Sequence, residues 1–125
     1  MVDKTTRQIL QTSFCNGKKH DFRLLKESKV RFNITTELLV DTGYQGLQKL
    51  HQNTRIPKKK TKKNPLSKED KQNNKLISSP RMLAEHVIRE IKIFKITSER
   101  YRNRRKRFGL RFNLIAGLYN FELNL

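Results

Sequence analysis

Cysteines, acidic residues and long apolar runs are all scarce in this chain of 125 residues. Cys15 is the only cysteine and has no cysteine or histidine nearby at zinc-ligand spacing, so we expect a buried structural thiol and a reducing compartment. No stretch approaches the roughly 20 apolar residues of a membrane-spanning helix. Residues 1–14 lack the apolar block of a secretory signal. These absences favour a cytoplasmic protein with one small domain.

The charge is strongly one-sided, with 29 Lys and Arg residues against 11 Asp and Glu residues and a net charge of +18. The corresponding pI is about 10.6. Such an excess is more than solubility requires, and its self-repulsion opposes folding unless a polyanion neutralises it. We therefore expect a nucleic acid as partner, which places the protein at the nucleoid.

The first half of the chain predicts short elements separated by turns. Residues 7–14 carry β-branched and aromatic side chains and predict an edge strand before the turn at Asn16-Gly17. Residues 20–28 predict a short helix. Residues 37–41, ELLVD, predict a buried strand that ends at Asp41. Because binding sites of α/β proteins gather at the carboxyl ends of strands, Asp41 is a candidate site residue, the alternative being a turn residue that caps the strand end.

The second half predicts a basic segment followed by helices. Residues 55–65 hold six Lys or Arg residues between Arg55 and Lys63 and predict an extended loop. Ser67, with Asp70 three residues later, predicts a helix N-cap, and a second, longer helix is expected over about 78–95. Its buried stripe would comprise Ala84, Val87, Ile88, Ile91 and Phe94. Residues 101–122 begin basic, become apolar and predict a packed final helix.

Asp41 and Glu85 are the two carboxylates most suited to chemistry. A strand-end aspartate and a helical glutamate offer the hard oxygen ligands that Mg²⁺ prefers, which suits phosphoryl transfer on DNA. The alternative for Glu85 is a solvated ion pair with Arg89, four residues later on the same helix. His20, His51 and His86 have no zinc-motif spacing, and His86 is expected to pack or to support a ligand.

Four segments resemble bacterial insertion-sequence transposases of the DDE type: NGKKHDFRLLKES, VDTGYQGLQKLH, RMLAEHVIREIKIFKI and YRNRRKRFGLRFNLIAGLYNFEL. In such enzymes the last catalytic glutamate follows an arginine by four residues and precedes a lysine by seven, as Glu85 does with Arg81 and Lys92. The resemblance covers nearly the whole chain, although Ser78 stands where the extended signature usually has a tyrosine.

The resemblance implies an α/β, ribonuclease H-like fold, in which a mixed sheet is flanked by helices and three carboxylates bind two Mg²⁺ or Mn²⁺ ions. Asp41 would be the second carboxylate and Glu85 the third. The first is expected on an opening strand that precedes this sequence, because Asp3 is expected in a turn and Asp21 as a helix N-cap. Residues 1–125 would then be the C-terminal part of the catalytic domain, incomplete at its N-terminus.

The resemblance and the charge together predict DNA contacts, whose alternative is ordinary solvated surface charge. The residues expected to make them are Arg81, Lys92, Lys58, Lys59, Lys60, Arg102, Arg104, Arg105, Lys106 and Arg107. Tyr101 and Phe108 flank the last cluster and could add stacking.

Three functions remain open at this point. The chain could be an active DNA-cleaving transposase, a fragment that is inactive by itself, or a non-catalytic protein. The last would be either an unrelated basic nucleic-acid-binding protein, for example a ribosome-associated one, or a regulator of transposition. We expect the second, with transposon-end and target DNA as partners and possibly the upstream half or a full-length copy of the transposase as well. Without one of three carboxylates, strand transfer should fall by several orders of magnitude.

Overall fold

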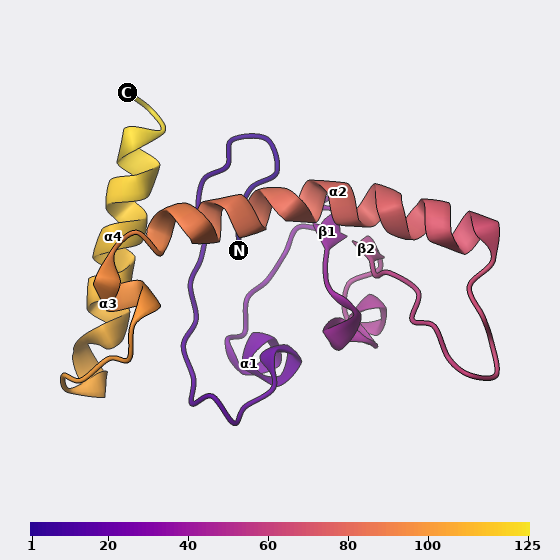
Figure 1. Cartoon of the computed structure of the whole chain (residues 1–125), viewed down its shortest axis with the longest axis horizontal. Helices are drawn as coiled ribbons and strands as arrows, with labels where there is room; N and C mark the ends of the chain where they lie inside the picture. Colours follow the sequence, from indigo (N-terminus) through magenta and orange to yellow (C-terminus); the bar gives the residue numbers. More distant parts are fainter. The chain divides into compact units, whose positions relative to one another are not determined.

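The computed structural model describes residues 1–125 and divides them into two compact units. The central unit comprises Cys15–Arg81, and the terminal unit comprises Met1–Phe14 together with Met82–Leu125. Helix α2, Lys68–Ile91, is the longest helix of the chain (Figure 1). Its residues up to Arg81 belong to the central unit, and those from Met82 belong to the terminal unit. No helix has the length and apolar character needed to cross a membrane.

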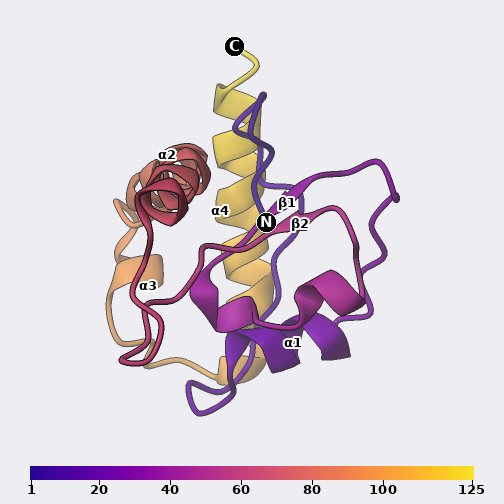
Figure 2. The same ribbon diagram turned by 90° about the vertical axis from the view of Figure 1, so that its right-hand side faces the viewer.

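The central unit contains a small parallel sheet. Strand β1, Leu38–Leu39, pairs with β2, Thr54–Arg55, so that Leu38 lies opposite Thr54 and Leu39 opposite Arg55 (Figure 2). Two 3-10 turns, η1 at Thr42–Tyr44 and η2 at Leu47–Lys49, lie in the connection between the strands. The helices and the parallel sheet agree with the expected α/β class. The strand predicted over 37–41 is confirmed in kind, but it is shorter than expected and only half buried.

Helix α1, Asp21–Glu27, confirms the short helix predicted over residues 20–28. Its N-cap is His20, whose Nδ1 accepts a hydrogen bond from the Phe22 N–H at 3.2 Å. The prediction that Asp21 is the N-cap is therefore wrong. Asp21 is the first helical residue, where its negative charge favours the positive end of the helix dipole.

Helix α2 begins at a capping box. The Ser67 Oγ accepts from the Asp70 N–H at 3.0 Å, and the Ser67 N–H donates to the Asp70 carboxylate at 3.1 Å, which confirms the predicted N-cap. The two separate helices expected here are wrong, since α2 is continuous through Pro80. It ends at Ile91 because the Thr97 hydroxyl and the Phe94 N–H both donate to the Ile91 carbonyl.

The terminal unit packs α4, Phe108–Glu122, with the last part of α2. It also holds α3, Lys95–Ser98, and a 3-10 turn η3, Arg105–Arg107. The core comprises Val87, Ile91, Ile115 and Tyr119, surrounded by Val2, Ile9, Ile96 and Phe112. Ile88 and Phe94 are 47% and 45% exposed, so the predicted buried stripe is wrong at these two positions.

The N-terminal segment does not form the strand predicted over residues 7–14. Ile9 makes only an isolated antiparallel bridge with Val2. Its N–H donates to the Asn120 Oδ1 at 2.8 Å and its carbonyl accepts from the Asn120 Nδ2 at 2.9 Å. An asparagine of α4 thus satisfies the main-chain groups that a neighbouring strand would otherwise pair.

Cys15 is exposed, so the predicted buried thiol is wrong. It lies just before the turn at Asn16, whose carbonyl accepts from the Lys19 N–H at 2.9 Å. The Cys15 thiol points at the Lys19 carbonyl at 4.0 Å. The turn chemistry therefore places the thiol at the surface of a tight loop and not in a core.

Candidate functional site

Asp41 follows β1 at the carboxyl end of the small sheet. One carboxylate oxygen accepts from the Thr42 N–H and caps η1, which agrees with the turn role considered as the alternative for this residue. The other oxygen lies 3.3 Å from the Arg81 guanidinium. The Asp41 side chain is 58% exposed and that of Arg81 is 28% exposed, so the carboxylate keeps an open side toward solvent.

The turn after Asp41 is held against α1. Gly46 has φ +92°, a left-handed conformation that glycine adopts without strain. The rings of Tyr44 and Phe22 make an edge-to-face contact with centroids 6.1 Å apart. Burial, followed by the charges of Asp21 and Asp41, raises the pKa of the Tyr44 hydroxyl. These contacts fix the strand end that carries Asp41.

Glu85 lies on α2, one helical turn after Arg81. Its side chain is exposed, and it forms no ion pair with Arg89, so the alternative of a Glu85–Arg89 pair is wrong. His86 is exposed as well, contrary to the expected packing role. The structure therefore shows Glu85 as a carboxylate that no neighbouring cation neutralises.

Lys92, the lysine of the predicted triplet, lies one residue beyond the end of α2. Its N–H still donates to the Ile88 carbonyl at 3.0 Å, so it continues the helical path. Its side chain is exposed. The expected spacing of Arg81, Glu85 and Lys92 along one helical path is thus retained.

In neither unit do three His, Cys, Asp or Glu side chains gather as a metal-binding cluster. The described ligand chemistry nevertheless suits a hard divalent cation, because the partly exposed carboxylate of Asp41 and the exposed carboxylate of Glu85 are hard donors. Asp41 belongs to the central unit and Glu85 to the terminal unit.

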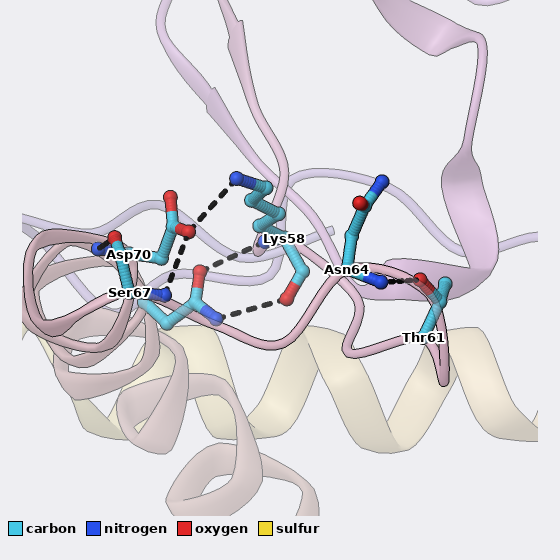
Figure 3. Close-up of polar contacts among 6 residues, drawn as sticks. Lys58, Thr61, Asn64, Ser67 and Asp70 are labelled. Atoms are coloured by element: carbon cyan, nitrogen blue, oxygen red, sulfur yellow. Dashed lines mark hydrogen bonds and ion pairs between the residues drawn. The ribbon is translucent and has the colours of Figure 1, made fainter.

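The cations of the basic segment 55–65 fall into a paired and an unpaired group. Arg55 pairs with Glu37, and the Lys58 ammonium lies 2.8 Å from the Asp70 carboxylate. Lys58 and the Ser67 N–H together lower the pKa of Asp70. The remaining cations are exposed and form no ion pair: Lys59, Lys60, Lys62 and Lys63. Figure 3 shows the polar contacts around this loop.

Sequence reasoning missed Asn74, which lies inside α2. Its side-chain amide accepts from the Lys58 N–H at 2.8 Å and donates to the Lys58 carbonyl at 2.9 Å. The available signal was an asparagine in a helix interior, where this residue is unfavourable unless its amide has a use. Lys62 and Lys63 were also left out of the predicted DNA contacts.

The second predicted DNA-binding cluster lies around η3. Its five cations are exposed and unpaired: Arg102, Arg104, Arg105, Lys106 and Arg107. Tyr101 and Phe108 contact each other edge to face at 5.0 Å, and the Arg111 guanidinium donates to the Tyr101 hydroxyl at 3.0 Å. Both rings therefore belong to the packing of the terminal unit.

The chain matches a protein family and a relative over nearly its whole length. The family described as DDE superfamily endonuclease matches residues 1–120. Over 125 residues the chain is 46% identical to a probable transposase for insertion sequence element IS702 from Microchaete diplosiphon, a match that covers 100% of this chain and 45% of the relative. The chain thus spans less than half the length of that relative. No solved structure matches.

Proposed function

We propose that this chain acts in DNA transposition through metal-dependent strand cleavage and transfer. The chain belongs to the DDE superfamily endonucleases, and its sequence is of the DDE insertion-sequence transposase type. Residues 1–125 would form part of the catalytic domain, with the ribonuclease H-like arrangement that the parallel pair β1 and β2 and the long helix α2 support. DNA at the transposon ends and at the target would be the substrate.

Asp41 and Glu85 are the proposed catalytic carboxylates and would hold Mg²⁺ or Mn²⁺. When bound, such ions polarise the phosphodiester and activate the attacking oxygen. The observation that carries the proposal is the sequence of charges along α2: Arg81 touches Asp41, and the exposed, unpaired Glu85 follows one turn later. An unneutralised carboxylate among so many cations is the group that a metal ion would use.

Arg81 has a defined task in this proposal. Its guanidinium lies against the Asp41 oxygen that does not cap η1, so it holds the side chain in place. Lys92 and the cluster of Arg102, Arg104, Arg105, Lys106 and Arg107 would bind DNA phosphates, since each is exposed and unpaired.

In this proposal Asp41 and Glu85 supply two of the family's three carboxylates, and Asp3 is not assigned as the remaining one because its side chain is held in a turn. Its Oδ1 accepts from the N–H groups of Thr5 and Thr6, both at 2.7 Å, and these bonds lower the pKa of Asp3. We therefore propose that the family's first carboxylate comes from a segment outside residues 1–125, and that these residues are inactive alone.

Nicking of a terminal-repeat DNA in Mg²⁺ tests this function. The chain would be assayed alone and mixed with a polypeptide that comprises the part of the IS702 relative it does not match. Cleavage is expected only in the mixture, and Glu85→Gln should abolish it. Glu69→Gln, the same change in the first turn of α2, should retain it. Cleavage that persists in Glu85→Gln would refute the assignment.

The second candidate is a non-catalytic regulator of transposition that binds DNA. The observation in its favour is the number of exposed cations without ion pairs at the basic loop and around η3. DNA binding without cleavage in the mixture, under conditions in which the two polypeptides associate, would establish this candidate in place of the first.

A further inference from the structure

We propose that the loop from Lys58 to Asn64, which we call the clasp, binds the phosphate backbone of duplex DNA through Lys59, Lys60, Lys62 and Lys63. Asn74 is the positioning residue that holds the base of this loop closed. The inference deepens the proposed function and rests on it, because it names the part of the central unit that holds the DNA. It also assigns Lys58 to the base of the clasp and not to the DNA.

The base of the clasp is closed by two independent contacts. Asn74 binds the main chain of Lys58 on both sides, through the bonds of 2.8 and 2.9 Å. The Lys58 ammonium reaches Asp70, one turn earlier on α2, at 2.8 Å. The Lys58 charge is thus paired with a carboxylate of α2, and the pair fixes where the loop leaves the sheet.

Two hydrogen bonds between Thr61 and Asn64 hold the other end of the loop. The Asn64 N–H donates to the Thr61 Oγ1 at 3.1 Å (Figure 3). The Thr61 N–H also donates to the Asn64 carbonyl at 3.3 Å. Pro57 and Pro65 flank the loop and restrict its backbone further. After Asn64 the chain returns to the capping box at Ser67, which shares Asp70 with Lys58.

This arrangement leaves four ammonium groups exposed on a short, closed loop. Lysine ammonium groups act as point charges toward phosphates, and the loop has no arginine fork for reading bases. Contacts of this kind fix the position of a duplex and carry no sequence information. A loop that is already closed also loses less conformational entropy when it binds.

The test is the affinity of the full chain for a short, mixed-sequence DNA duplex, measured by fluorescence anisotropy in EDTA over about 50 to 200 mM NaCl. A fourfold variant carries Lys59→Gln, Lys60→Gln, Lys62→Gln and Lys63→Gln. The slope of its plot of log affinity against log salt should be smaller in magnitude by about 3.6, because each of the four phosphate contacts contributes about 0.9.

Asn74→Ala removes no charge, so it isolates the positioning role. We expect the dissociation constant to rise about fivefold, since the freed loop must be ordered on binding, while the salt slope stays near that of the wild type. Trypsin should cut between Lys59 and Lys63 faster in this variant. Asn73→Ala, at the adjacent exposed position of α2, is the matched control and should change neither quantity.

Circular dichroism verifies that each variant retains its helices. An Asn74→Ala protein that binds and is cut like Asn73→Ala would overturn the positioning role, and an unchanged salt slope in the fourfold variant would overturn the phosphate contacts. If polyglutamate competes as strongly as unlabelled DNA, the loop binds acidic proteins equally well, and this result would overturn the DNA assignment. Because EDTA removes metal, these results are independent of whether Glu85 supports cleavage.

Discussion

Arg81 lies against Asp41, with a guanidinium nitrogen 3.3 Å from a carboxylate oxygen. The pair joins the end of the small sheet to α2 within the central unit. It places an internal cation beside the carboxylate that we propose as a metal ligand. The Arg81 charge is therefore expected to influence metal binding by Asp41.

Replacing this internal cation should strengthen metal binding. Arg81→Gln removes a positive charge next to Asp41, so Mn²⁺ should bind several-fold more tightly, while the free energy of unfolding should fall by less than about 1 kcal/mol because the pair is partly exposed. Isothermal titration with Mn²⁺ and urea unfolding measure the two effects. Arg89→Gln on the same helix is the control; equal Mn²⁺ affinities of the two variants would contradict the expected competition.

The burial pattern of α2 predicts unequal costs for identical substitutions. Ile91 is 5% exposed and packs with Val87, Ile115 and Tyr119, whereas Ile88 is 47% exposed. Ile91→Ala should lower the free energy of unfolding by about 2 to 3 kcal/mol through lost burial and a cavity, and Ile88→Ala by well under 1 kcal/mol. Urea unfolding measures both. A larger loss in Ile88→Ala would place the core on the other side of α2.

Asn120 anchors the N-terminal segment to α4 through the N–H and the carbonyl of Ile9. Asn120→Ala leaves both part-buried main-chain groups without this partner, so we expect a loss of about 1 to 3 kcal/mol in the free energy of unfolding. Hydrogen exchange at the Ile9 amide should accelerate at the same time. The control is Asn113→Ala, which removes an exposed bond to Thr12; a loss of equal size there would argue against a special role for Asn120.

Asp70 makes the base of the basic loop sensitive to acid. Lys58, then the Ser67 N–H, lower the pKa of its carboxyl. Because the folded-state pKa is depressed, the stabilisation is fully present above the unfolded value of about 3.9 and is lost as the pH falls through the folded value.

Asp70→Asn should therefore flatten the decline in the free energy of unfolding below about pH 4. The measurement is urea unfolding across that range, with Glu69→Gln as the neighbouring control. A wild-type decline in Asp70→Asn would show that this carboxylate does not contribute to the acid dependence.

Local signals in the sequence predicted the local structure well. The turn after Asp41 and the cap at Ser67 depend on residues only a few positions apart. The final helix predicted over 101–122 begins only at Phe108, so the prediction that the basic residues form its start is wrong. The failure at Ile9 has a long-range cause. Ile9 does not form the predicted strand because its main-chain groups bind Asn120, which is 111 positions away. A prediction from the residues near position 9 does not include this partner.

The candidate site divides in the same way. Asp41 and Glu85 were predicted from residue type and family resemblance, and the structure adds the Arg81 contact and the absence of a Glu85–Arg89 pair. The role of Asn74 required the fold, because it arises only when the basic loop returns 16 positions later to the start of α2.

The central claim is that Asp41 and Glu85 bind divalent metal, and Mn²⁺-induced broadening of amide resonances tests it most directly. Mn²⁺ at submillimolar to millimolar concentration should selectively broaden the amide signals of Thr42 and His86, which follow the two carboxylates in sequence, and both effects should weaken in Asp41→Asn and in Glu85→Gln. Broadening that spares either amide, or that is the same in the two variants as in the wild type, would contradict the claim.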